Sequence, residues 1–348
     1  MSSLNRPLWA SLFLGWMLVQ APAHGDTFLL TPSDTRLVGT VRYIKSRAED
    51  TLVDIALLHG QGYDEIRSAN PRVDAWLPGQ GTPITIPSQY LLPDAVREGI
   101  IVNLGEMRLY YYPEPGLGVP PSVITYPIGI GRDDWPSPTG ATKIIQKIPQ
   151  PAWYPPASIR AEHAAQGRPL PMLVPAGPDN PLGQYAMRLG ISGYLLHGTN
   201  KRYGVGMRVS HGCIRLYPAD IEALFSQVPN GTRVELIDQP YKAGVHNGRL
   251  YVEVHERRNE NGVTKGDFTE LLDVVHQALA QQSHLLSGTP DLAQLPALYE
   301  RASGMPIALD TVRGGLTEKT PQRVDSRPPA VRNHILGLRV TNSEQPIP

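Results

Sequence analysis

The chain has 348 residues, enough for two or more domains that each bury their own core. Its 32 Lys and Arg residues balance 32 Asp and Glu residues, so no net positive charge attracts nucleic acid or an anionic membrane. We therefore expect no nucleic-acid partner. The single cysteine excludes an internal disulfide, and the 35 prolines are about twice the usual share of roughly 5%.

Residues 1–23 have the three-part pattern of a secretory signal peptide. An apolar run follows Arg6, and Ala21-Pro22-Ala23 forms an A-x-A cleavage site. The run is shorter than the roughly twenty residues that span a bilayer, so the mature protein is expected to be exported without a transmembrane segment. Outside the cytoplasm an unpaired thiol is either buried and inert or kept for its chemistry.

Residues 37–93 predict a small unit with the order strand, helix, helix, strand. The strands are expected at 41–44 and 83–87, and Asp50 is the expected N-cap of the first helix.

This unit resembles the LysM module, which binds N-acetylglucosamine-containing glycans such as peptidoglycan. The resemblance rests on Asp50-Thr51-Leu52, Ile55-Ala56, Asn70-Pro71, Leu77-Pro78-Gly79-Gln80 and the strand at 84–87. The family's usual glycine before Asp-Thr-Leu is Glu49 here, so a spacer that no longer binds sugar is the alternative.

Residues 99–238 predict a mainly β domain. Strands at 100–104 and 108–112 flank Gly105-Glu106 as a hairpin. Further strands are expected over 123–130, 185–189, 194–196 and 234–237. A helix from Pro218 is expected to place Ile221, Leu224, Phe225 and Val228 on one face.

Nine prolines fall within residues 149–181, a stretch without helical or strand periodicity. Such a stretch inside a domain is either a functional lid or a disordered linker. We favour the lid, because Trp153, Tyr154 and other apolar residues are interspersed and strands are expected on both sides.

Residues 240–310 are expected to form an appended α/β subdomain. Its predicted elements are a strand at 250–254 and a helix capped by Asp267 and Glu270. From residue 314 to 348 the sequence is polar and rich in proline, which predicts a disordered tail.

The single cysteine, Cys213, lies in a string of residues suited to nucleophilic catalysis. A cysteine nucleophile needs a base, donors for an oxyanion and a group that orients the base. His197 ends one strand and Cys213 begins the next segment, so imidazole and thiol can lie side by side. Backbone amides near Gly212 and Cys213 can face the reacting carbonyl.

Each residue also has a simpler interpretation. Cys213 alone is a small buried hydrophobe, and His197 alone is a strand-end histidine bonded to the backbone. His211 is a candidate metal ligand, but His246 and His255 do not complete a zinc site at convincing spacing. We therefore expect neither a metal nor another cofactor.

Together the residues are more specific than they are singly. The strings His197-Gly198-Thr199 and Ser210-His211-Gly212-Cys213-Ile214-Arg215-Leu216 closely resemble the signature of the L,D-transpeptidase (YkuD-type) catalytic domain. The similarity covers residues 99–238 and includes Pro138-Thr139-Gly140. With the LysM-like unit and the appended subdomain, the chain resembles periplasmic ErfK-type members.

The resemblance implies a YkuD-like β-sandwich with a short helix. It implies Cys213 as the nucleophile and His197 as the proton donor and acceptor, with the carbonyl of Gly198 orienting the imidazole. The remaining motif residues are assigned to site architecture or substrate contact, and they are Ser210, His211, Gly212 and Arg215.

The implied reaction acts on peptidoglycan tetrapeptide stems in the periplasm. The diaminopimelate acyl group passes through a cysteine thioester, D-alanine leaves, and an amine accepts the acyl group. The acceptor is the lysine of a Braun-type lipoprotein or a second diaminopimelate; with water instead, the enzyme is an L,D-carboxypeptidase. A cell-wall cysteine peptidase and a non-enzymatic peptidoglycan-binding protein are the other hypotheses.

Overall fold

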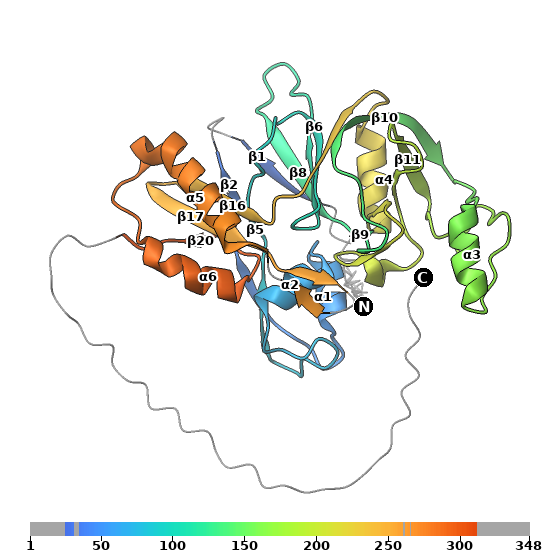
Figure 1. The fold of residues 1–348 in the computed structure, drawn as a ribbon, viewed down its shortest axis with the longest axis horizontal. Coiled ribbons are helices and arrows are strands. Elements are labelled where there is room, and N and C mark those ends of the chain that lie inside the picture. The colour runs from blue at the N-terminus through green and yellow to red at the C-terminus, as the bar shows by residue number, and fades with distance from the viewer. Residues whose placement is uncertain (1–24, 31–34, 260–261, 265, 312–348) are drawn as a thin grey trace, which may run out of the picture.

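The computed structural model describes residues 25–30, 35–259, 262–264 and 266–311 (Figure 1). The predicted signal peptide at 1–23 and the predicted tail at 314–348 lie outside these residues. Within the described part, no helix has both the length and the apolar character to cross a membrane.

A nine-stranded sheet forms the centre of the molecule, in the order β1-β8-β7-β6-β15-β10-β11-β12-β14. Its strands are β1 (Asp26–Leu29), β6 (Gly99–Asn103), β7 (Arg108–Tyr112), β8 (Ser122–Pro127), β10 (Gly140–Pro149), β11 (Tyr185–Leu189), β12 (Leu195–His197), β14 (Ile214–Arg215) and β15 (Arg233–Ile237). A separate pair joins β9 (Ile130–Gly131) to β13 (Arg208–Ser210). The mainly β prediction and the β6–β7 hairpin are confirmed.

Strand β10, which the sequence analysis missed, bends this sheet. Its residues 140–143 pair with β15, whereas residues 144–149 pair with β11 on the other edge. The register shifts between Ile144 and Gln146, and such irregularities increase local twist. The strands assigned to a sandwich therefore belong to one continuous, curled sheet rather than to two separate sheets.

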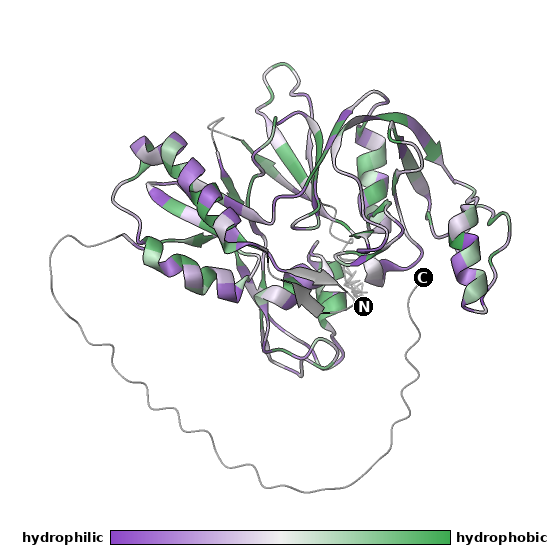
Figure 2. Cartoon of the chain, in the orientation of Figure 1, coloured by the Kyte–Doolittle hydropathy of each residue, from purple (hydrophilic) through white to green (hydrophobic). Residues whose placement is uncertain are grey.

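Helix α4 (Pro218–Gln227) packs against the core of this sheet, and Pro218 begins it as predicted. Ile221, Leu224 and Val228 are fully buried, while Phe225 is only partly buried. Burying each of these aliphatic side chains stabilises the fold by about 1.5–3 kcal/mol. Figure 2 shows the apolar residues of α4 beside the sheet strands.

The proline-rich segment 149–181 is folded, not a linker. It contains helix α3 (Ala157–Ala165), which the sequence analysis missed because only Ile159 and His163 of the helix are buried. The Asn180 side-chain amide donates to the carbonyls of Pro151, Val174 and Pro175 at 2.9–3.2 Å. These bonds close the segment, called the cap below, upon itself.

The N-terminal unit has the predicted order of strand, helix, helix and strand. Its elements are β2 (Leu37–Gly39), β3 (Arg42–Lys45), α1 (Leu52–Leu58), α2 (Tyr63–Ala69), β4 (Pro83–Ile86) and β5 (Gln89–Leu91), with β3 antiparallel to β4. The prediction that Asp50 caps α1 is wrong by one residue: Thr51 accepts from the amide of Asp54 at 3.1 Å. Asp50 instead accepts from the amide of Arg47, because its position leaves it outside the first turn.

The C-terminal unit packs helix α5 on a small antiparallel sheet. Its elements are β16 (Tyr241–His246), β17 (Arg249–Val254), β18 (Arg257–Asn259), β19 (Gly262–Thr264), α5 (Phe268–Gln282), α6 (Leu295–Arg301) and β20 (Ile307–Ala308). Asp267 caps α5 as predicted, accepting from the amide of Thr269 at 2.8 Å. In Figure 1 this unit lies on the opposite side of the sheet from the cap.

Candidate active site

Two neighbouring strands bring the predicted histidine and cysteine together. His197 ends β12, Cys213 directly precedes β14, and the two strands pair in parallel with His197 opposite Arg215. His197 and Cys213 line one cavity of about 260 Å³ with Ser210, His211 and Arg215. The structure therefore places the predicted side chains around a single pocket.

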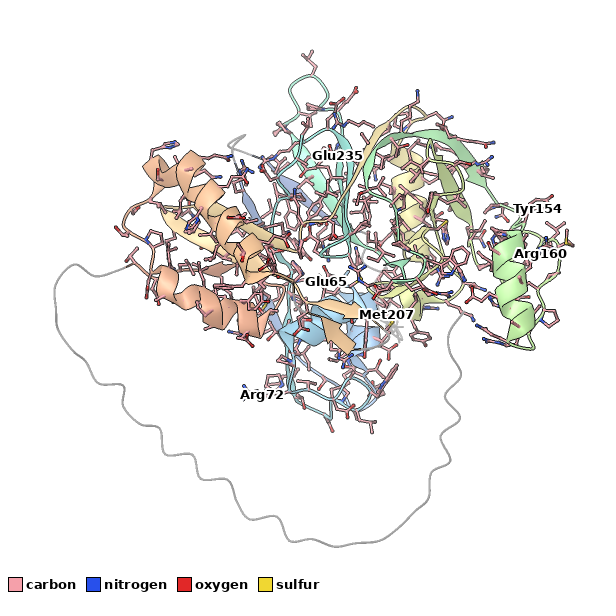
Figure 3. All side chains as sticks on the ribbon, viewed as in Figure 1. Glu65, Arg72, Tyr154, Arg160, Met207 and Glu235 are labelled. Atoms are coloured by element: carbon pink, nitrogen blue, oxygen red, sulfur yellow. The ribbon has the colours of Figure 1, made fainter. Side chains whose placement is uncertain are left out.

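The cap forms the apolar wall of this pocket. The lining residues that it contributes include Trp153, Ile159, Leu170 and Val174. Figure 3 labels Tyr154 and Arg160, which mark the cap at the edge of the molecule. An apolar wall opposite a thiol is suited to keeping water away from a reactive acyl group.

His197 is buried, with 3% of its surface exposed. Its Nδ1 donates to the carbonyl of Gly198 at 2.6 Å, since a carbonyl can only accept. Burial, together with the charge of Arg215, lowers the pKa of His197 to about 3. The imidazole is therefore neutral at pH 7, with Nε2 as its proton-accepting nitrogen.

Cys213 is partly exposed, and its thiol makes a long hydrogen bond of 3.7 Å to the carbonyl of Gly193. Burial raises the pKa of this thiol, and the amide of Leu195 and the charge of Arg215 oppose the increase. The thiol is therefore protonated at neutral pH, and it can act as a nucleophile only if a base removes its proton.

Ser210 and Ser137 hold the backbone on either side of Cys213. The Ser210 hydroxyl donates to the carbonyl of Cys213 at 2.6 Å and accepts from the amide of Gly212 at 3.1 Å. The Gly212 amide, an expected oxyanion donor, is thus engaged within the loop. Ser137 donates to the carbonyl of Gly212 at 2.8 Å. Ser137 was not among the predicted site residues, although it directly precedes the Pro138-Thr139-Gly140 turn.

Gly212 is the residue that this loop geometry requires. Its φ of +98° belongs to the left-handed region that favours glycine. A Cβ there would lie 2.7 Å from the ring of Tyr194.

His211 links the segment 198–212, called the catalytic loop below, to the cap. Its Nε2 lies 2.8 Å from a carboxylate oxygen of Glu162 on α3, and because a carboxylate only accepts, that nitrogen carries the proton. The other oxygen of Glu162 accepts from Arg132 at 2.6 Å. Burial lowers the pKa of His211, against the opposing effect of Glu162. Arg132 and Glu162 were not among the predicted site residues, since no local pattern joins residues so far apart in the sequence.

Arg215 gives the pocket a basic end. Its side chain is buried, and within the described residues its Nε has no hydrogen-bond partner. Burial lowers the pKa of this guanidinium. Lys201 lines the same pocket. A buried guanidinium beside an ammonium group favours the carboxylate of a ligand.

A second group of ionisable residues lies outside the pocket, and we call it the C-terminal junction. Glu106, Glu253 and His255 offer potential metal ligands within 4.8 Å of one another. The ammonium of Lys242 lies 2.7 Å from both carboxylates and takes the place that a cation would need. This group is therefore a buried ion cluster, and His255 belongs to it rather than to the residues that line the Cys213 pocket.

A protonated thiol, a buried neutral imidazole and a basic subsite lie around one pocket, an arrangement that can support nucleophilic catalysis by a cysteine. The model of the YkuD family, described as the L,D-transpeptidase catalytic domain, matches residues 97–236. The chain belongs to the L,D-transpeptidase family and is an enzyme of that class.

The relatives extend beyond the catalytic domain. Probable L,D-transpeptidase YcfS of Escherichia coli is 43% identical over 301 residues, which cover 85% of this chain and 92% of the relative. Probable L,D-transpeptidase ErfK/SrfK of Salmonella typhimurium is 41% identical, covering 86% of this chain and 96% of the relative. The solved catalytic domain of the E. faecium L,D-transpeptidase is 22% identical with a TM-score of 0.30, covering 42% of this chain and 100% of that domain.

Proposed function

We propose that the chain is exported to the periplasm and transfers diaminopimelate acyl groups of peptidoglycan tetrapeptide stems through a thioester on Cys213. Three observations support this function: the family of the chain, the pocket that joins Cys213 to His197, and the secretory pattern of residues 1–23. The observation that carries it is the neutral His197, whose Nδ1 is fixed on Gly198 and whose Nε2 accepts protons.

In the first step, Nε2 of His197 takes the thiol proton and the sulfur of Cys213 attacks the diaminopimelate carbonyl carbon. The tetrahedral intermediate then collapses. The bond from that carbon to the nitrogen of D-alanine breaks, and protonated His197 gives its proton to the departing amine. A thioester on Cys213 and free D-alanine result.

In the second step, an amine attacks the thioester carbon and His197 takes the proton that the amine loses. The carbon–sulfur bond breaks, and the sulfur recovers a proton from His197. The acceptor is the lysine of a Braun-type lipoprotein, which gives a protein anchor, or a second diaminopimelate, which gives a cross-link. Water as the acceptor makes the same site an L,D-carboxypeptidase.

The basic end of the pocket suits this substrate. Both D-alanine and diaminopimelate carry carboxylates, and the unpartnered Nε of Arg215 offers a charge-assisted donor to one of them. Lys201 supplies a second positive charge on the same wall. We assign Arg215 to substrate contact, and Ser210, His211 and Gly212 to the architecture of the loop.

We further propose three functional parts within residues 37–93, 99–238 and 240–310. An apolar cluster within each part supports this division, and a fourth cluster packs Val38, Tyr90 and Leu92 of the first part against Ile101 and Tyr110 of the second. The first part is proposed to be a LysM-like module that binds peptidoglycan glycan. Its antiparallel β3–β4 pair with two intervening helices and the exposed side chains of Trp76 and Leu77 support that assignment.

Incubation of the protein with tetrapeptide muropeptides tests the nucleophile. We expect a mass increase located on Cys213, and release of D-alanine that Cys213→Ala lowers by at least about 10³-fold with the melting temperature retained. A lysine-ended lipoprotein peptide in one arm, and buffer alone in another, separates anchoring from cross-linking and hydrolysis. D-alanine release by folded Cys213→Ala would overturn the mechanism.

A further inference from the structure

The N-terminal unit directly contacts the loop that joins His197 to Cys213. The amide of Tyr63 donates to the carbonyl of Val205 at 3.2 Å, and the amide of Asp64 donates to the carbonyl of Gly206 at 3.1 Å. On its other side, Gly206 donates to the carbonyl of Ile128 at 3.1 Å. The middle of the catalytic loop is therefore held between the first turn of α2 and the sheet domain.

The contact between α2 and the loop is too close for side chains. Gly206 has a φ of +80°, and a Cβ there would collide with the backbone of Gly62 and Tyr63. A Cβ on Gly62 would lie 2.8 Å from the Cα of Gly206. Two glycine backbones in direct contact transmit a small displacement of the unit to the loop, because no flexible side chain lies between them.

A buried ion pair fixes this turn of α2. Glu65 accepts from the amide of Gly62 at 2.5 Å, and its two oxygens accept from Arg108 of β7 at 2.7 and 2.9 Å. The exposed fractions of the two side chains are 8% and 0%. Figure 3 labels Glu65 where the N-terminal unit meets the sheet, with Met207 of the catalytic loop nearby. We call Glu65 and Arg108 the N-terminal junction.

A further bond reaches the chain beyond Cys213. The hydroxyl of Tyr217 donates to the carbonyl of Gln61 at 3.1 Å in a buried position. Arg108 also donates to the carbonyl of Gly60 at 3.2 Å. Residues 60–65 thus contact the catalytic segment both before and after its nucleophile.

We propose that residues 60–65 are part of the active-site scaffold, and that Gly62 and Glu65 are positioning residues for acyl transfer. They hold the loop at Val205 and Gly206 so that Cys213 keeps its place relative to His197. This inference rests on the proposed function, because it assigns a role in the reaction of Cys213. It makes the N-terminal unit a working part of the catalytic site in addition to any role in binding glycan.

The variant Gly62→Ala tests this link while keeping both members of the ion pair, since the added Cβ would lie 2.8 Å from Gly206 but 3.3 Å from Oε2 of Glu65. The φ of −82° at Gly62 suits alanine, so the added methyl group acts mainly by pressing on Gly206. A misplacement of about 1 Å at an active site costs about 10²-fold in rate. We expect kcat for D-alanine release to fall about tenfold or more, with KM changed less than about threefold.

The matched control is Gly81→Ala in the same unit. Gly81 has a φ of +79°, and a Cβ there meets nothing within 4 Å, so alanine strains the backbone without pressing on the loop. We expect this variant to lower the melting temperature and to keep the wild-type kcat. Loss of kcat in Gly81→Ala equal to that in Gly62→Ala would show a general effect of destabilisation and overturn the inference.

If Gly62→Ala does not fold, a second variant, Glu65→Gln, tests whether residues 60–65 position the loop for the reaction. It removes the charge opposite Arg108 without adding heavy atoms. We expect kcat to be lower when it is calculated per molecule whose Cys213 reacts with a thiol reagent. Wild-type kcat in the folded variant would contradict the proposal. Failure of the wild-type protein itself to form an adduct on Cys213 would instead reject the proposed function.

Discussion

The β6–β7 hairpin carries two buried ion clusters that face different neighbours. In the N-terminal junction, Arg108 of β7 pairs with Glu65 beside the catalytic loop. In the C-terminal junction, Glu106 of the hairpin turn pairs with Lys242, which also pairs with Glu253. Neither cluster lines the Cys213 pocket, but the first bonds to the turn of α2 that contacts the loop before Cys213.

The two clusters show that a buried ion pair has consequences that depend on which elements it joins. A buried ion pair contributes little net stability, because desolvation offsets attraction, but it fixes the orientation of the elements that it joins. One pair orients an element that contacts the catalytic loop. The other cluster orients β5, β16 and β17. Lys242 of β16 also donates to the carbonyl of Leu91 in β5, and Glu253 of β17 accepts from the amide of Leu91.

The largest loss of stability is expected from Lys242→Met. Burial alone would lower the pKa of Lys242, but Glu106 and Glu253 raise it, so that the ammonium is charged in the folded protein. Without this ammonium group, the buried carboxylates of Glu106 and Glu253 lose their main partner. We expect the free energy of unfolding in urea to fall by about 3–5 kcal/mol, with kcat per folded molecule unchanged.

Lys45→Met is the control for Lys242→Met, because Lys45 is exposed on β3. A change within about 0.5 kcal/mol is expected for this surface position. A fall in kcat of the folded Lys242→Met protein as large as that of Gly62→Ala would erase the functional difference between the two junctions.

A smaller effect is expected at Asp220, a buried carboxyl near the N-terminal junction. Its Oδ2 has no hydrogen-bond partner in the described part of the chain. Burial raises the pKa of Asp220 to about 8, against the opposing charge of Arg108. The folded protein therefore binds a proton that the unfolded chain releases near pH 4, so stability falls as pH rises from about 4 to about 8.

Asp220→Asn removes this dependence. We expect the variant to be as stable as the wild type near pH 4 and more stable than the wild type at pH 8, because the amide needs no proton. Urea unfolding at a series of pH values measures the difference. A variant that is less stable at pH 8 would mean that Asp220 is ionised and paired with Arg108 in the folded protein.

The sequence predicted the parts of the fold whose signals are local. The β6–β7 hairpin has an apolar run on either side of Gly105-Glu106, and α4 begins with a proline and repeats its apolar residues at helical spacing. Strand β10 was missed because it changes partners along its length, and α3 because it buries only two residues. In both cases tertiary contacts, which leave no periodic pattern, decide the structure.

The candidate site divides in the same way. Cys213, His197 and the loop residues form one recognisable string, and the structure brings them to one pocket. The residues that support the string come from distant segments: Ser137 bonds to Gly212 and Glu162 to His211, while Glu65 bonds to Gly62, whose backbone lies against Gly206. Only Glu65 and Gly62 are close in sequence, and their contact with Gly206 depends on how the N-terminal unit docks.

The smallest change in stability is expected at a third ion cluster, formed by Glu162, His211 and Arg132 at the rim of the pocket. Glu162 is 25% exposed, so its pairs contribute about 0–1 kcal/mol. Its oxygens nevertheless join the cap to the catalytic loop. Glu162→Gln is expected to leave the free energy of unfolding almost unchanged and to loosen the cap.

A looser cap admits water to the thioester, so we expect the ratio of hydrolysis to transfer to rise about two- to threefold in Glu162→Gln. Mass spectrometry of muropeptide products with an added acceptor amine measures this ratio, and Glu114→Gln, at an exposed position remote from the pocket lining, is the control. An unchanged ratio in Glu162→Gln would show that the cap is held closed by its apolar contacts alone. Of the three ion clusters, only the N-terminal junction would then affect the reaction. The exposed Glu162 cluster would contribute little to stability and nothing to the ratio of products.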